Sequence, residues 1–156
     1  MVLDGVTIRD CMVKDLALIQ EIENASFDDP YPLSLFHYFL KRFPRGFRVA
    51  SLEETLVGYC VVVLEHRKAL IASLAVNPSY RGGRVGKRLL QDAIDLCKTQ
   101  FNVSNIELQV RVDNRAAIAL YSRFGFLVGT PIRDYYGEGK DALSMSLQLS
   151  KKSASS

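Results

Sequence analysis

The chain has 156 residues, of which 48% are hydrophobic and 24% are charged. This composition is typical of a globular protein, and the length predicts one domain over residues 1–149. The formal net charge of +3 is too small to indicate a nucleic-acid-binding protein. The polar residues at the C-terminal end predict a disordered tail over 150–156.

The three cysteines, Cys11, Cys60 and Cys97, are widely separated, and the chain has only two histidines. This pattern predicts neither a disulfide framework nor a metal site. We therefore expect reduced, buried thiols and a cytoplasmic location. No basic N-terminal region precedes a long apolar run, and the apolar runs have strand length, so we expect no signal peptide and no membrane contact.

Strand and helix patterns are mixed in the first half of the chain. Asp15 can cap a helix whose apolar face contains Leu16, Ile19 and Ile22. The other elements expected there are a strand at 6–9, a loop with two prolines at 26–32, a helix at 33–43, and strands at 47–52, 56–64 and 69–76.

The second half continues this mixture. The elements expected there are a helix at 87–100, a strand at 106–112, a helix at 115–123 capped by Asp113 or Asn114, and strands at 126–133 and 142–149. Helices and hairpins are interspersed in this order. The sequence therefore predicts an α+β protein with a mixed central sheet.

A glycine-rich basic turn lies between a predicted strand and a predicted helix, in the segment V-N-P-S-Y-R-G-G-R-V-G-K-R-L-L that starts at Val76. Backbone N–H groups at a helix N-terminus bind anions, glycines allow close approach, and basic side chains add positive potential. The spacing fits neither a P-loop nor a dinucleotide fingerprint. A different phosphate-binding turn is indicated, and a basic surface turn without a ligand is the alternative.

Three further segments accompany this turn. The first is Ser73–Val76, directly before it. The second runs from Leu108 through Asn114 and Tyr121 to Phe126, and the third, from Tyr135 to Met145, reads Y-Y-G-x-G-x-D-A-x-x-M. With the near Arg-x-x-Gly-x-Gly turn, they resemble the GNAT acetyltransferases over nearly the whole chain. Within that superfamily they resemble archaeal and ribosomal-protein N-terminal acetyltransferases. The resemblance implies a mixed, mostly antiparallel sheet of about seven strands flanked by about four helices.

The resemblance also implies an acetyl-coenzyme A site and direct transfer of acetyl to the α-amine of a protein or peptide N-terminus, ribosomal proteins included. The residues expected to bind the coenzyme are Leu74, Ala75, Val76, Arg81, Gly82, Gly83, Arg84, Val85, Gly86, Lys87, Asn114 and Tyr121. Tyr121 is also expected to protonate the leaving thiolate. The residues expected to bind the peptide are Phe27, Pro30, Tyr31, Tyr135 and Tyr136. No metal, nucleic acid or membrane is expected to take part.

Two positions depart from the family pattern. Arg84 stands where the family loop has glycine, and a non-glycine residue disfavours positive φ by about 1 kcal/mol or more. Gln109 stands where relatives often have Glu or His, and its amide cannot take a proton near neutral pH. The candidates for handling the amine's proton are Glu107 on the same strand face, Glu65 at the end of an adjacent strand, and a water held by Gln109.

Losing a base affects different amines unequally. An α-amine has a pKa of about 7.7–8.0, so its neutral form at pH 7 costs about 1 kcal/mol, whereas a lysine amine costs roughly 4–5 kcal/mol. Gln109 therefore favours an N-terminal substrate. The alternatives are a GNAT enzyme that acetylates a small-molecule amine or polyamine, and a non-catalytic acyl-coenzyme A-binding regulatory module.

Overall fold

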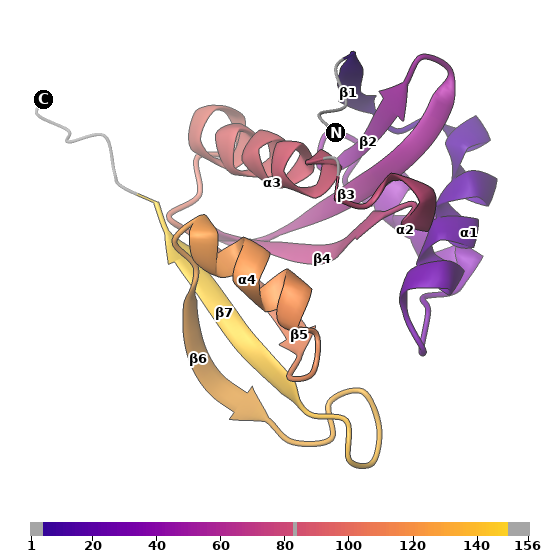
Figure 1. Ribbon diagram of the computed structural model, residues 1–156. Helices are drawn as coiled ribbons and strands as arrows, with labels where there is room; N and C mark the ends of the chain where they lie inside the picture. The colour runs from indigo at the N-terminus through magenta and orange to yellow at the C-terminus, as the bar shows by residue number, and fades with distance from the viewer. Residues whose placement is uncertain (1–4, 83, 150–156) are drawn as a thin grey trace, which may run out of the picture. The chain divides into compact units, whose positions relative to one another are not determined.

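The computed structural model describes residues 5–82 and 84–149. Its helices and strands, which can be followed in Figure 1, are β1 (Val6–Asp10), α1 (Leu16–Ser26), α2 (Leu33–Arg42), β2 (Phe47–Leu52), β3 (Thr55–Glu65), β4 (Lys68–Val76), α3 (Val85–Leu96), β5 (Asn105–Arg111), α4 (Arg115–Arg123), β6 (Leu127–Ile132) and β7 (Ala142–Gln148). The predicted tail at 150–156 and Gly83 lie outside the described residues.

The strands form one seven-stranded sheet in the order β1-β2-β3-β4-β5-β7-β6. The pairs β1–β2, β2–β3, β5–β7 and β6–β7 are antiparallel, and β4 runs parallel to β5. With the four helices, this is the mixed, mostly antiparallel α+β architecture that the element order predicts. The predicted fold class is confirmed.

Residue contacts divide the described chain into two compact units. Among the described residues, the first unit contains 5–63, 72–82 and 84–96, and the second contains 64–71 and 97–149. The division falls inside β4, so the two ends of this strand belong to different units. One domain over residues 1–149 stays a prediction.

In the first unit, helices cover both faces of the sheet. Consecutive residues of a strand point to opposite faces. In β3, Tyr59 contacts Glu23 of α1, whereas a Cβ added at Gly58 would lie 3.0 Å from Leu89 Cδ1 of α3. Helices α1 and α3 therefore lie on opposite faces (Figure 1), which explains why β3 is buried along most of its length.

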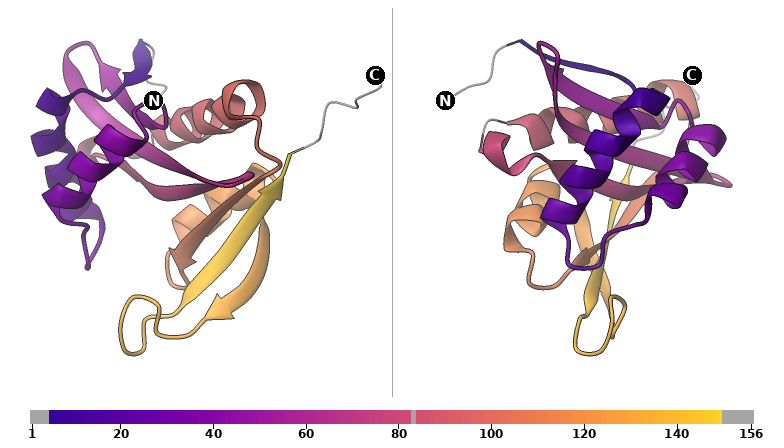
Figure 2. Two further views of the ribbon diagram at one scale, coloured as in Figure 1. Left: turned by 180° about the vertical axis from the view of Figure 1, so that it is seen from behind. Right: turned by 90° about the vertical axis from the view of Figure 1, so that its right-hand side faces the viewer.

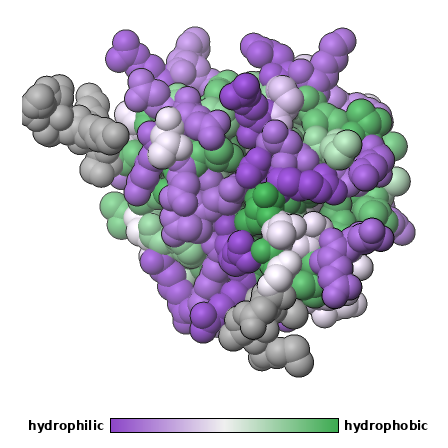
Figure 3. Space-filling view, turned by 90° about the horizontal axis from the view of Figure 1, so that it is seen from above, coloured by the Kyte–Doolittle hydropathy of each residue, from purple (hydrophilic) through white to green (hydrophobic). Residues whose placement is uncertain are grey.

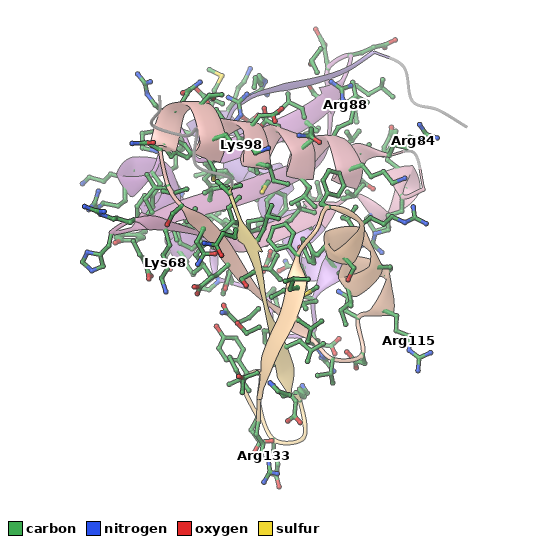
Figure 4. The ribbon with its side chains drawn as sticks, turned by 90° about the vertical axis from the view of Figure 1, so that its left-hand side faces the viewer. Lys68, Arg84, Arg88, Lys98, Arg115 and Arg133 are labelled. Atoms are coloured by element: carbon green, nitrogen blue, oxygen red, sulfur yellow. The ribbon has the colours of Figure 1, made fainter. Side chains whose placement is uncertain are left out.

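In the second unit, β5 pairs with β7 from Asn105 opposite Gln148 to Arg111 opposite Ala142. Every second residue of β5 is buried, which leaves Glu107 and Gln109 on its more accessible face. Figure 2 shows α4 beside β5, β6 and β7, and Figure 4 places Arg133 at the far end of the hairpin that β6 and β7 form. The strand pattern thus separates core residues from candidate site residues.

The surface carries both hydrophilic and hydrophobic side chains. Hydrophilic side chains cover much of the face shown in Figure 3, with smaller hydrophobic patches between them. Among the described helices, none is both long enough and apolar enough to cross a membrane.

The three cysteines are free and buried, as the sequence predicts. Burial raises the pKa of the Cys11 thiol and of the Cys97 thiol to about 12. Because the thiolate is the nucleophilic form, neither side chain is suited to covalent catalysis near neutral pH.

The bounds of the third helix differ from the prediction. Helix α3 begins at Val85 instead of residue 87, and after Leu96 the chain makes one π-helical turn, Cys97–Phe101. A π-helical turn adds a residue to the helical repeat. The 3.6-residue pattern at 87–100 therefore located the helix but did not reveal where its α-helical part ends.

The expected side-chain cap by Asp15 was wrong. Asp15 directly precedes α1, but its carboxylate makes no capping hydrogen bond to that helix. It accepts hydrogen bonds from the Met12 N–H at 2.7 Å and from Arg9 Nη1 at 2.8 Å. Burial acts to raise the pKa of Asp15, but these hydrogen bonds outweigh it and hold the pKa below its ordinary value.

We expect Asp15→Asn to lower the free energy of unfolding at pH 7 by about 1–2 kcal/mol, a value reduced because Arg9 is partly exposed. The pKa of Asp15 is lowered from 3.8 on folding. Its contribution is therefore present above about pH 4 and is lost as the pH falls through the lower folded-state pKa. Urea denaturation of both proteins at pH 7 and pH 3 measures this change. A difference between them that stays constant with pH would contradict the assignment.

Candidate active site

Local hydrogen bonds build the turn that follows β4. The Asn77 side chain accepts a hydrogen bond from the Ser79 N–H at 2.9 Å, and the Asn77 carbonyl accepts one from the Tyr80 N–H at 2.8 Å. They enclose a short 3-10 turn, Pro78–Tyr80. The turn leads the chain from the end of β4 toward the start of α3.

Arg81 ties this turn to its surroundings in the first unit. Its Nε donates to the Val76 carbonyl at 3.2 Å, and its Nη2 donates to the Ser26 hydroxyl at 3.0 Å. Arg81 thus links the end of β4 to the end of α1. Its predicted contact with the coenzyme stays a prediction.

The N-terminus of α3 presents main-chain donors. The Arg88 N–H bonds to the Arg84 carbonyl at 3.1 Å, and the N–H groups of Val85, Gly86 and Lys87 come before that bond. The first N–H groups of an α-helix generally have no acceptor within the helix. Together with the helix dipole they form a site suited to an anion. Val85 is 1% exposed, so it anchors this end of the helix in the core.

Arg84 adopts a backbone conformation that favours glycine. Its φ is 71°, in the left-handed region. Figure 4 shows Arg84 at the N-terminal end of α3, and its side chain is exposed. A left-handed non-glycine residue costs about 1 kcal/mol or more. Strain is therefore stored at the predicted diphosphate turn.

We expect the free energy of unfolding of Arg84→Gly to exceed that of Arg84→Ala by up to about 1 kcal/mol. Both variants lose the charge, and only glycine relieves the strain. Thermal or urea denaturation measures the difference.

Both variants should bind coenzyme A less tightly than the wild type in calorimetry, because each removes a positive charge from the turn. Equal stability of the two variants would show that Arg84 is unstrained in solution.

In the second unit, three predicted residues come together. The Tyr136 hydroxyl donates to the main-chain carbonyl of Gln109 at 3.1 Å. The Tyr136 ring meets the Tyr135 ring edge to face, with centroids 4.8 Å apart, and the Tyr136 N–H bonds to the Lys140 carbonyl at 3.0 Å. The paired tyrosines are thereby fixed to the strand that carries Gln109.

Tyr121 and Asn114 belong to the segment of α4. Tyr121 is 7% exposed, and its ring centroid lies 5.7 Å from that of Phe126. The Asn114 side chain accepts a hydrogen bond from the Ala117 N–H at 3.1 Å, so its expected role as a helix cap is confirmed. Proton transfer by Tyr121 and a coenzyme contact by Asn114 stay predictions.

The two glutamates suggested as bases have different surroundings. Glu107 accepts hydrogen bonds from Lys68 Nζ at 3.2 Å and from Asn105 Nδ2 at 3.0 Å, one on each carboxylate oxygen. Glu65 is exposed at the end of β3. These surroundings single out neither glutamate as the general base, and both roles stay predictions.

The loop between α1 and α2 holds the predicted peptide-binding residues Phe27, Pro30 and Tyr31. Tyr31 is half-buried, and its ring centroid lies 6.2 Å from that of Phe36 and 6.1 Å from that of Phe39. Phe27 is half-buried and Pro30 is exposed. Their contact with a peptide stays a prediction.

A buried polar cluster near this loop was missed from the sequence. Glu23 is 2% exposed and accepts hydrogen bonds from the Tyr31 N–H and the Ser73 hydroxyl, each at 2.9 Å, and from the Tyr59 hydroxyl. Burial, followed by the adjacent Glu23 carboxylate, raises the pKa of Tyr59, which keeps its phenol protonated. Glu23 lies one turn after Ile19 on the apolar face of α1. A carboxyl group on the apolar face of a helix indicates a buried polar interaction, and this signal was present in the sequence.

Residues 16–126 match the acetyltransferase (GNAT) family. The chain belongs to this family. All twelve of the predicted coenzyme-binding residues lie within this matched range. The GNAT assignment makes the protein an acyltransferase.

The chain is similar to proteins that are named as N-acetyltransferases. It is 34% identical to a putative ribosomal protein bS18-alanine N-acetyltransferase of Bacillus subtilis over 140 residues, which cover 88% of this chain and 92% of that protein. It is 33% identical to an N-alpha-acetyltransferase of Sulfolobus acidocaldarius over 154 residues, which cover 91% of this chain and 92% of that protein.

A solved structure extends this similarity. Arabidopsis thaliana Naa50, in complex with the bisubstrate analogue CoA-Ac-MVNAL, superposes with a TM-score of 0.84 at 25% identity and covers 93% of this chain and 99% of its own. That GNAT protein binds the coenzyme A portion of the analogue.

Proposed function

We propose that this GNAT enzyme transfers the acetyl group of acetyl-coenzyme A to the α-amine of protein or peptide N-termini, ribosomal proteins included. The observation that carries the proposal is the hydrogen bond from Tyr136 to the Gln109 carbonyl. This bond holds Tyr135 and Tyr136 against β5. The two tyrosines are expected to bind a peptide backbone, and Gln109 of β5 is expected to hold the water that accepts the amine's proton. The names of the relatives support the same substrate, and the free cysteines support a cytoplasmic location.

Strand β4 supplies the proposed thioester site. Its ladder with β5 joins Lys68 to Asn105, Ala69 to Ile106 and Leu70 to Glu107, and β4 continues to Val76 beyond these pairs. Main-chain groups of Leu74–Val76 on this edge are not used by that ladder. An N–H group there can donate to the acetyl carbonyl and stabilise the oxyanion that forms on attack.

The proposed reaction needs no covalent enzyme intermediate. The neutral α-amine attacks the thioester carbon, so a C–N bond forms and the C–S bond breaks. Tyr121 donates its phenolic proton to the leaving thiolate, and the proton lost by the amine passes through a water held at Gln109 to bulk solvent. Tyr121 then regains a proton from solvent, which completes the cycle. The diphosphate binds the N–H groups of Val85–Lys87.

Turnover with acetyl-coenzyme A on peptides that vary in their first two residues tests the proposal, with mass spectrometry locating the added acetyl. We expect acetylation of the α-amine and none of an internal lysine. Acetylation of polyamines in place of peptides would instead support a small-molecule enzyme. Coenzyme binding without any turnover would support a regulatory module.

Tyr136→Phe tests the peptide site. This variant removes the hydroxyl that holds the turn on Gln109 and keeps the ring beside Tyr135. We expect the peptide KM to rise about threefold to tenfold, since one neutral hydrogen bond is lost, while the KM for acetyl-coenzyme A stays within about twofold. Initial rates at varied concentrations of each substrate measure both values. A larger effect on the coenzyme would place Tyr136 at the other substrate.

A further inference from the structure

Helix α1 holds both main-chain groups of Tyr31 in the loop that follows it. Gln20 Nε2 donates to the Tyr31 carbonyl at 2.9 Å, and Glu23 Oε2 accepts from the Tyr31 N–H at 2.9 Å. Pro30 and Pro32 flank Tyr31 and have no N–H group. Tyr31 therefore supplies the only main-chain donor of the segment 30–32, and Glu23 uses it.

The same carboxyl group also binds the sheet. Glu23 Oε1 accepts hydrogen bonds from the Ser73 hydroxyl of β4 at 2.9 Å and from the Tyr59 hydroxyl of β3. The Tyr59 and Ser73 hydroxyl oxygens lie 3.2 Å apart. One oxygen of Glu23 thus accepts a hydrogen bond from the loop, and the other accepts hydrogen bonds from β3 and β4. We call these four residues, Glu23, Tyr31, Tyr59 and Ser73, the Glu23 cluster.

The Glu23 cluster is closed to solvent at its centre. Glu23, Tyr59 and Ser73 are 2%, 0% and 7% exposed. Burying a carboxyl group is costly, and an apolar residue of similar size would fill this part of the core at lower cost. A satisfied buried network instead specifies one arrangement of the groups it joins. Here it specifies where the α1–α2 loop lies on the sheet.

The two carboxylate oxygens of Glu23 bind residues next to the two proposed substrate sites. Ser73 directly precedes Leu74–Val76, which is proposed to bind the thioester, and Tyr31 belongs to the loop proposed to line the peptide site. We infer that Glu23 is a positioning residue that holds the α1–α2 loop against β4, so that a bound peptide N-terminus is aligned with the thioester strand. This inference rests on the proposed function.

Kinetics of Glu23→Ala test the positioning role, with Ile22→Ala as a matched control. Ile22 is the preceding residue of α1, is 4% exposed and also loses core packing when truncated. We expect Glu23→Ala to raise the peptide KM by about tenfold or more and to change the acetyl-coenzyme A KM by less than about twofold. Glu23→Gln, which keeps an acceptor for the Tyr31 N–H, should restore most of the peptide affinity. The inference is overturned if Ile22→Ala, at an equal loss of Tm, raises the peptide KM as much.

Amide exchange of Tyr31, observed by NMR with 15N-tyrosine and without substrates, provides a readout independent of activity. Exchange should be about 100-fold faster in Glu23→Ala than in the wild type and nearly unchanged in Ile22→Ala. Unchanged protection in Glu23→Ala would overturn the inference. If the wild type acetylates no peptide, the proposed function fails, and Tyr31 exchange still decides whether Glu23 holds the loop.

If Glu23→Ala does not fold, Gln20→Ala takes its place. This change removes the bond to the Tyr31 carbonyl, and Gln20 is only half-buried. A rise in the peptide KM of about threefold with an unchanged coenzyme KM supports the inference. An unchanged peptide KM overturns it, because the loss of one of the two hydrogen bonds that hold Tyr31 on α1 would then leave the alignment of the loop unaffected.

Discussion

Tyr121→Phe is expected to lower kcat by about 100-fold to 10,000-fold, the range usual for loss of a general acid. The variant keeps the aromatic ring that packs 5.7 Å from Phe126 and removes only the phenol oxygen. Because the leaving thiolate then lacks its proton donor, the chemical step slows. Single-turnover rates with saturating acetyl-coenzyme A and peptide measure the effect.

Two controls make the Tyr121 result specific. Calorimetry should show coenzyme affinity within about threefold of the wild type, because the proposed proton transfer belongs to the transition state. Tyr38→Phe removes the hydroxyl of a tyrosine that is 54% exposed on α2, and its rate should equal that of the wild type. A Tyr121→Phe rate equal to wild type would eliminate the general-acid role.

Gly86→Asp is expected to weaken coenzyme A binding about 100-fold. Gly86 lies in the first turn of α3, beside the N–H groups proposed to bind the diphosphate. A carboxylate about 5 Å from a phosphate charge costs roughly 3 kcal/mol at an effective dielectric constant of 20. The same carboxylate is favourable near a helix N-terminus by about 0.3–1 kcal/mol. Tm should therefore not fall while affinity in calorimetry does.

Gly86→Asn is the matched control, because it has nearly the shape of aspartate without its charge. We expect Gly86→Asn to weaken binding by less than about tenfold, since it removes only the close approach that glycine permits. An affinity of Gly86→Asp equal to that of the wild type would show that the diphosphate binds elsewhere. Equal losses in both variants would assign the effect to steric contact and not to charge.

Local patterns account for the success of the fold prediction. Strand β2 spans Phe47–Leu52 and helix α4 spans Arg115–Arg123, as the sequence predicts. Alternation, helical periodicity and the Asn114 cap each involve residues within a few positions of one another. Such signals survive in the sequence because the interactions that produce them are themselves local.

The glycine-rich turn shows where local reasoning stops. The sequence identified the turn, but it left open whether Arg84 would adopt the glycine-like conformation. The structure gives Arg84 a φ of 71°. The surrounding contacts, such as those of Arg81 with Val76 and Ser26, hold the turn in place. Strain at one residue can persist where neighbouring interactions determine the backbone.

The order of strands and helices, the GNAT-like turn and the residue types available for acetyl transfer can all be predicted from local sequence patterns. By contrast, three-dimensional packing brings Glu23 to Tyr59 and Ser73, 36 and 50 residues away, and Tyr136 to the Gln109 carbonyl, 27 residues away. These partners depend on strand register and on which polar groups share one buried space. Neither is encoded by the spacing of neighbouring residues, because a buried carboxyl group accepts hydrogen bonds from whichever donors the packing brings to it.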